Sequence, residues 1–149
     1  MQEEGIQAFV CFHMDQHNSE YIAPCDERIA FISGFTGSNG VCVVTMDDAR
    51  MWTDGRYYLQ AERQLEQGWT MQKMEQAVPS WFMFIKTSLS EGQIVGINYA
   101  QYPASGLEMR KKFFEDASLT VKCVPNLVDA VWGDERPARP ANPVNVLDI

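Results

Sequence analysis

Four side chains near the start of the chain have the chemistry of zinc ligands: Cys11, His13, His17 and Cys25. Zinc prefers thiolate and imidazole, and structural zinc sites usually pair ligands roughly two to four residues apart in each half. Cys11 and Cys25 form neither half, and Cys11 is more simply a small buried apolar residue. His13 and His17 are the only histidines in the sequence. We therefore assign no metal ligand in this chain.

A nucleophilic cysteine is the second chemistry that the residue types allow. A catalytic thiol needs a lowered pKa and a positioned base. Cys25 precedes Asp26 and Glu27, whose negative charge raises a thiol pKa, and Cys42 falls within a β-branched stretch typical of a strand. The sequence contains no G-x-S-x-G motif, so it does not indicate a nucleophilic serine of the hydrolase type. We assign no catalytic residue.

A glycine-rich loop at 34–40 (GFTGSNG) allows positive φ and close backbone approach, as phosphate loops require. No lysine follows it, and the next segment reads as a strand and not as a helix. The context therefore excludes a P-loop or a dinucleotide-binding loop. A tight turn leading into Val41 is favoured over a substrate-facing loop.

The segment 51–57 (MWTDGRY) combines a strand end, a capping aspartate, a glycine and an arginine. Ligand-facing residues of α/β sheets gather at the carboxyl ends of strands. A cation near a helix N-terminus opposes the helix dipole, so local helix stability does not explain Arg56. Two interpretations stay open: Arg56 pairs with Asp54, or it reaches a carboxylate or carbonyl outside the domain.

The elements that must position these loops follow from apolar runs that alternate with helical patterns, which is typical of an α/β domain. We expect strands at 6–12, 28–31, 41–46, 50–53, 69–74, 94–98 and 119–124, with a hairpin turn at 47–48. We expect helices at 55–67, 81–89, 103–115 and 127–132, with Asp54, Ser80 and Asn126 as N-caps, and a helical turn at 21–24.

Two of these helices carry unusual apolar patterns. The run 81–85 (WFMFI) is apolar on almost every face, so its helix is buried on two sides or packs against a partner. In the helix at 103–115, Leu107 and Phe114 lie opposite Met109 and Phe113. We expect one pair to pack on the sheet and the other to meet a neighbouring element.

Composition narrows the class of protein. The chain has 149 residues, 46% of them hydrophobic and 21% charged, which suits about one globular domain. A formal charge of −8 argues against a nucleic-acid binder, and four dispersed cysteines do not form a disulfide scaffold. The acidic start (MQEE) and the short apolar stretch after it favour a cytoplasmic protein without a membrane segment.

Three prolines follow Trp132, at positions 137, 140 and 143. Proline lacks a backbone donor and restricts the residue before it, so 133–149 reads as an extended connector. We expect a domain at 1–132 and a linker at 133–149 that leads to a further domain.

Three strings carry a family resemblance: HNSEYIAPCDER at 17–28, ISGFTGSNG at 32–40 and MWTDGRYYLQA at 51–61. Together with NLVDAVW at 126–132 and RPARP at 136–140, they resemble the N-terminal domain of aminopeptidase P, an Xaa-Pro aminopeptidase of the creatinase/prolidase group. The resemblance covers essentially the whole chain.

The resemblance implies a mixed β-sheet flanked by helices, with the chemistry located elsewhere. In this family a C-terminal domain binds two divalent metal ions, typically manganese, and removes the residue that precedes proline. No metal ligand of that domain carries over to this chain, so we expect no cofactor here and no activity from the chain alone. Arg56 carries over as a substrate-facing residue, and Tyr57 and Phe35 are further candidates. Some relatives have an acidic residue in place of Thr36.

The implied partners are the protein's own C-terminal catalytic domain, an Xaa-Pro peptide and a second subunit in a homodimer. The domain would then shape the peptide site and take part in subunit contacts. The alternative is a free-standing protein-interaction module on the same fold, with the apolar run 81–85 as its partner surface. A downstream segment with spaced Asp, His and Glu ligands would distinguish the two.

Overall fold

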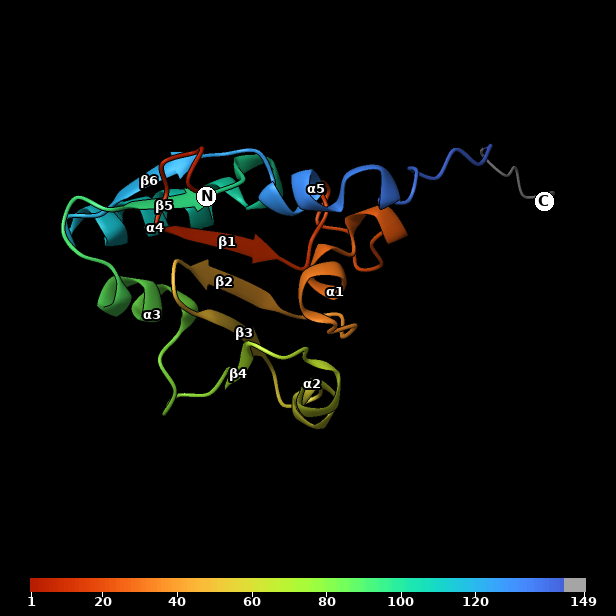
Figure 1. The fold of residues 1–149 in the computed structure, drawn as a ribbon, viewed down its shortest axis with the longest axis horizontal. Helices are drawn as coiled ribbons and strands as arrows, with labels where there is room; N and C mark the ends of the chain where they lie inside the picture. The colour runs from red at the N-terminus through yellow and green to blue at the C-terminus, as the bar shows by residue number, and fades with distance from the viewer. Residues whose placement is uncertain (144–149) are drawn as a thin grey trace.

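The computed structural model describes residues 1–143 and contains one six-stranded mixed sheet in the order β4-β3-β2-β1-β5-β6 (Figure 1). The strands are β1 (Ala8–Phe12), β2 (Val41–Thr45), β3 (Ala49–Thr53), β4 (Trp69–Lys73), β5 (Ile94–Ile97) and β6 (Thr120–Cys123). β2 runs antiparallel to both of its neighbours, as the opposed arrows of β1 and β2 illustrate, whereas the other three pairings are parallel. The carboxyl ends of all strands except β2 therefore lie at one edge of the sheet.

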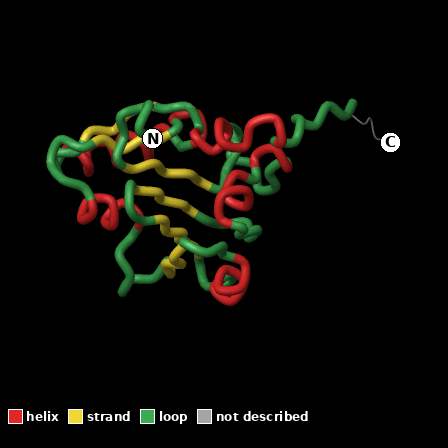
Figure 2. Tube along the Cα trace, in the orientation of Figure 1, coloured by secondary structure: helices red, strands yellow, loops and turns green. Residues whose placement is uncertain are grey.

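Helices cover both faces of the sheet (Figure 2). They are η1 (Pro24–Asp26), α1 (Arg28–Ser33), α2 (Tyr58–Gln64), α3 (Trp81–Ser88), η2 (Tyr99–Gln101), α4 (Ala104–Glu115), α5 (Leu127–Trp132) and η3 (Gly133–Glu135). β1 is buried along its whole length, with Val10 in the core beneath α3 and α4 and Cys11 in the core beneath α1, α2 and α5. A central strand that is covered on both faces explains why its sequence is a continuous apolar run.

The expected strand at 28–31 is wrong, because these residues begin helix α1. Ile29 and Ser33 are buried one helical turn apart, and Ser33 Oγ donates to the Ile29 carbonyl at 2.7 Å. Gly34 ends the helix in the left-handed region (φ 78°), and its N–H donates to the Ala30 carbonyl. A short apolar run does not distinguish strand from helix by itself, and Gly34 is the signal that would have decided it.

The other expected strands are confirmed to within two residues at each end. Asn126 caps α5 as predicted, since its Oδ1 accepts from the Val128 N–H at 3.0 Å. The helix expected at 55–67 is shorter, and its N-cap is Tyr57 instead of Asp54, whose carboxylate is occupied by Arg56. The helical turn expected at 21–24 lies slightly later, as η1.

The two apolar helices pack largely against the sheet. In α4, Leu107 and Phe114 are buried on it, whereas Phe113 packs edge-on against Phe82 of α3 and Met109 is 64% exposed. In the run 81–85, three of the five side chains are buried in the core of this chain, namely Trp81, Phe84 and Ile85. The sequence prediction of one pair on the sheet is thus confirmed.

The segment after α5 begins with a turn of 3-10 helix, η3, where the sequence predicts an extended connector. Residues 136–143 contain no helix or strand, and 144–149 of the expected linker lie outside the described residues. Figure 1 shows this segment leaving the domain beside α5. Among the described helices, none has the length and apolar character needed to cross a membrane.

Candidate functional site

Polar side chains converge at the carboxyl edge of the sheet, where β3 ends and the glycine-rich loop enters β2. Thr53 is the last residue of β3, and its hydroxyl donates to the Asn39 carbonyl at 2.7 Å. The loop at 34–40 is thereby fastened to the segment that carries Asp54 and Arg56. This edge is where α/β sheets usually present ligand-facing groups.

Asp54 and Arg56 form a two-point ion pair at this edge. Nε and Nη2 of Arg56 donate to the two carboxylate oxygens of Asp54, each at 2.9 Å, and the Arg56 N–H donates to Oδ1 at 3.0 Å. The interpretation that Arg56 pairs with Asp54 is therefore realised in the structure. The Arg56 side chain is nevertheless 66% exposed, and Nη1 has no acceptor among residues 1–143.

The ionised form of the Asp54 carboxyl is strongly favoured over the protonated form. The Arg56 guanidinium, helped by Asn39, holds the pKa of the Asp54 carboxyl well below its usual range, although partial burial acts in the opposite direction. Asn39 Nδ2 donates to Oδ2 at 2.6 Å. The carboxylate is thus held from two sides, and it fixes the guanidinium in one orientation.

Tyr57 and Phe35 connect this ion pair to the core. The Phe35 ring is 1% exposed and packs edge-on against Tyr57, with 5.9 Å between ring centroids. The Tyr57 hydroxyl lies 2.6 Å from Ser38 Oγ, and the Arg56 guanidinium lies 5.1 Å from the Tyr57 ring centroid. Because the Phe35 ring is buried, a contact between it and a peptide would require the loop to move.

The glycine-rich loop packs closely on the domain and bends at Ser38 and Asn39, where the sequence predicts a tight turn. A Cβ on Gly34 would lie 2.6 Å from the Gln64 carbonyl oxygen, and one on Gly37 would overlap the Phe35 ring. Thr36 binds α2, because its N–H donates to Gln64 Oε1 at 3.0 Å and its hydroxyl accepts from Gln60 Nε2 at 3.1 Å. The glycines therefore serve close packing of the loop on α2 and on Phe35.

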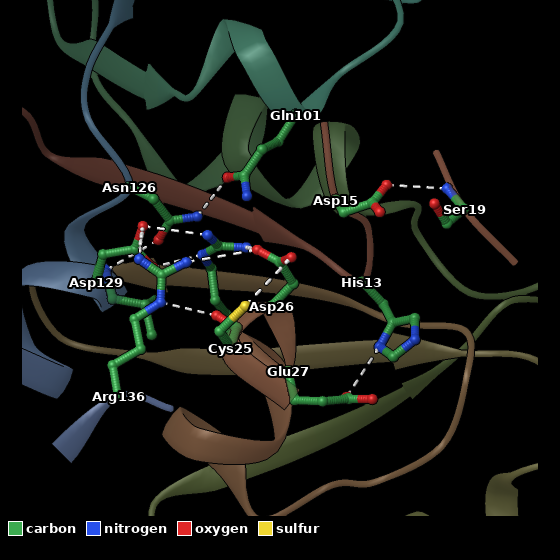
Figure 3. A network of polar contacts seen from close by, with 12 residues as sticks. His13, Asp15, Ser19, Cys25, Asp26, Glu27, Gln101, Asn126, Asp129 and Arg136 are labelled. Atoms are coloured by element: carbon green, nitrogen blue, oxygen red, sulfur yellow. Dashed lines mark hydrogen bonds and ion pairs between the residues drawn. The ribbon is translucent and has the colours of Figure 1, made fainter. Parts of the chain in front are cut away.

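A second polar network, which the sequence did not indicate, joins η1, α1 and α5 (Figure 3). Arg28 is 3% exposed and binds Asp26 through Nη1 at 3.0 Å and Asp129 through Nη2 at 3.1 Å. Arg136 reaches the same two carboxylates. We call Asp26, Arg28, Asp129 and Arg136 the charged cluster. Burial acts to lower the pKa of Arg28, but the two aspartates raise it above its usual range.

The four side chains with zinc-ligand chemistry do not converge. Cys11 is buried in the core, and burial raises the pKa of its thiol to about 12. His13 faces Glu27, with 3.8 Å between Nδ1 and Oε2, whereas His17 is exposed and Cys25 donates to Asp26. Within residues 1–143, no three His, Cys, Asp or Glu side chains are placed to share a metal ion.

The chain is similar in sequence to part of several curated proteins. It is 48% identical over 152 residues to a protein of Coprinopsis cinerea named "Probable Xaa-Pro aminopeptidase P", and 45% identical over 151 residues to its namesake in Laccaria bicolor. The alignments cover 99% and 100% of this chain but 24% of each relative. The chain thus spans about a quarter of the length of these relatives.

Solved structures are similar to the chain as well. An X-prolyl aminopeptidase from Caenorhabditis elegans, described as a cytosolic enzyme with a di-nuclear active site, matches with a TM-score of 0.90 and 36% identity over 96% of this chain and 24% of that one. The N-terminal domain of a cytoplasmic peptidase from Mycobacterium tuberculosis matches with a TM-score of 0.62 and 21% identity over 87% of this chain and 90% of its own. The second match shows the fold alone.

The resemblance seen in the sequence is confirmed by a family model, that of the Creatinase/Prolidase N-terminal domain, which matches residues 1–131. The mixed sheet flanked by helices that this resemblance implies is also the architecture observed. The chain therefore belongs to the creatinase/prolidase N-terminal domain family.

Proposed function

We propose that this chain is the non-catalytic N-terminal domain of an Xaa-Pro aminopeptidase, an enzyme that removes the N-terminal residue preceding proline. Its role is to orient the peptide at a catalytic site located elsewhere in the protein. The support is its family membership, together with relatives named Xaa-Pro aminopeptidase P of which it spans about a quarter. We place the domain at 1–132 and the linker at 133–149.

One observation carries the proposed role: Arg56 donates two hydrogen bonds to Asp54 yet stays largely exposed at the carboxyl edge. A guanidinium in a fixed orientation offers its remaining N–H groups to a carbonyl or carboxylate without further ordering cost. A peptide backbone or its carboxylate terminus supplies such acceptors. Tyr57, beside Arg56, offers a ring face and a hydroxyl at the same place.

The metal chemistry belongs to the rest of the protein in this proposal. A pair of divalent ions, with manganese the expected metal, would activate water and polarise the scissile carbonyl there. The side chains of residues 1–143 do not fit such a centre, because no three potential ligands meet. We therefore expect the isolated chain to release no residue from an Xaa-Pro peptide.

A cytoplasmic location, a homodimer and subunit contacts made by this domain are part of the proposal. The first draws on the relative from C. elegans, which is described as cytosolic. The alternative of a free-standing interaction module is less well supported, because most of the run 81–85 that would form its partner surface is buried in the chain's own core.

The test uses the whole protein that contains this chain. Arg56→Met removes the guanidinium and keeps the side-chain length, and Arg63→Met, at an exposed site on α2, is the matched control. We expect Arg56→Met to raise KM for Xaa-Pro peptides about tenfold, with bound metal unchanged, because it removes a binding contact. Unchanged KM on short and long Xaa-Pro peptides would remove the substrate role of Arg56, and a whole protein that cleaves no such peptide would refute the proposed function.

A further inference from the structure

The charged cluster ties the segment after α5 to the body of the domain. Arg136 makes three contacts: Nε donates to the Cys25 carbonyl at 2.8 Å, Nη1 binds Asp129 Oδ2 at 2.9 Å and Nη2 binds Asp26 Oδ1 at 3.4 Å. Its side chain is 23% exposed. All three nitrogens of the guanidinium therefore have partners, which lie on η1 and α5.

Arg28 makes the attachment point rigid. It binds the same two carboxylates from within the core, so each aspartate lies between two guanidinium groups. Two positive charges balance two negative charges, and both Arg28 and Asp26 are almost fully buried. Hydrogen-bonded pairs of this kind hold a fixed geometry, because loss of one partner leaves a buried charge unpaired.

Arg136 lies at the point where the chain leaves the domain. Arg136 lies beyond residue 131, where the family match ends, and prolines follow it at 137, 140 and 143. Proline-rich segments are semi-rigid and extended, at about 3.1 Å per residue. A direction imposed on the chain at Arg136 is therefore transmitted along the segment that follows.

We propose that Arg136 is a positioning residue that sets the direction in which the chain leaves this domain and thereby places Arg56 at the peptide site of the full enzyme. This inference rests on the proposed function. Arg136 contacts no peptide and acts through the charged cluster. A tethered module has a high effective concentration at its target only when its linker has a suitable length and stiffness. Release of the linker lowers that concentration, which weakens peptide binding and leaves the chemical step unchanged.

The experiment again uses the whole protein. Arg136→Met breaks the three contacts, and Arg139→Met, in the same repeated Arg-Pro pattern but exposed and without an ion pair to any described residue, is the control. Arg136→Lys retains the charge without the guanidinium fork. A second variant inserts two glycines between Arg139 and Pro140, which loosens the exit while every atom of the charged cluster stays in place.

We expect Arg136→Met and the glycine insertion each to raise KM for Xaa-Pro peptides about three- to tenfold with kcat within twofold of wild type, and Arg136→Lys to recover part of the loss. Small-angle X-ray scattering should show a larger radius of gyration for both variants and no change for Arg139→Met. A mere loss of stability in the domain would not make the insertion behave like Arg136→Met.

The two proposals fail separately. If wild type cleaves Xaa-Pro peptides but Arg136→Met changes neither KM nor the radius of gyration, the positioning role is wrong and the proposed function stands. The same conclusion follows if the glycine insertion leaves KM unchanged. If wild type cleaves no Xaa-Pro peptide, the proposed function is wrong, and the positioning role, which rests on it, is overturned as well.

Discussion

Both carboxylate oxygens of Asp54 accept hydrogen bonds from Arg56, two residues later. Nε of Arg56 donates to Oδ1 and Nη2 donates to Oδ2, each at 2.9 Å. The two side chains lie at the end of β3, where the chain turns toward α2. Because Asn39 donates to the same carboxylate from the neighbouring loop, the pair cannot rotate freely. The orientation of Arg56 is therefore a property of this edge and is set before any peptide arrives.

Asp54→Asn tests whether that orientation matters. An amide offers one oxygen and no charge, so the two-point contact is lost and Arg56 becomes mobile. In the whole protein we expect KM for Xaa-Pro peptides to rise about threefold or more, and the double variant with Arg56→Met to be no worse than Arg56→Met alone. Steady-state kinetics of the single and double variants measure this coupling.

A matched control lies at the opposite end of the sheet. Asp48 and Arg50 form a pair of the same spacing beside the β2–β3 turn, with Arg50 Nε donating to Asp48 Oδ2 at 2.8 Å. Asp48→Asn should leave KM unchanged. Additive effects of Asp54→Asn and Arg56→Met on KM would show that Asp54 does not act through Arg56.

Gly37→Ala tests the packed form of the glycine-rich loop. The new Cβ would overlap the Phe35 ring and lie 2.8 Å from its Cε2 atom. Because Phe35 is buried, its ring cannot move aside without disturbing the core, and we expect a loss of about 1–3 kcal/mol in the free energy of unfolding. Denaturant unfolding measures this loss. Gly55→Ala is the control, since its nearest contact is Tyr58 at an ordinary 3.8 Å; equal stabilities of the two variants would contradict the packing.

Local signals predicted what depends on local neighbours. Asn126 was identified as an N-cap because a cap bonds to an N–H two residues later. The end of α1 also has a local signal, because Gly34 adopts the left-handed conformation that often ends a helix, and this argues against a strand at 28–31. The central strands were readable because burial on both faces makes them continuously apolar.

Contacts between residues far apart in the chain could not be predicted from the sequence. Arg28 and Asp129 are 101 positions apart in the sequence, and nothing near either residue indicates that they pair in the core. The resemblance selected Arg56 as the candidate site residue, but only the structure decided that Asp54 holds it. Phe35 belongs to the glycine-rich loop, yet its burial and its packing against Tyr57 follow from tertiary structure.

We expect His13 to make the stability of the fold depend on pH. Its side chain is 8% exposed, and burial lowers its pKa from the usual 6.5, even though Glu27 Oε2 lies 3.8 Å from Nδ1. The folded chain therefore keeps His13 neutral where the unfolded chain takes up a proton. By linkage, the unfolded state binds more protons just below pH 6.5, so the free energy of unfolding falls as pH decreases from about 6.5 toward the folded pKa, and it is retained above 6.5.

His13→Gln should flatten this decline, because glutamine takes up no proton in either state. Glu27 affects stability with the opposite sign and at lower pH. Burial, with help from Asp26, raises the pKa of its carboxyl above the usual 4.5. Its contribution to the free energy of unfolding is therefore lost as pH rises above about 4.5. Denaturant unfolding between pH 5.5 and 7.5, scored as the difference between wild type and His13→Gln, isolates the histidine from Glu27. His17→Gln, at an exposed position, is the control for removing an imidazole. Superimposable pH profiles for wild type and His13→Gln would show that burial of His13 does not govern the acid side of the stability curve.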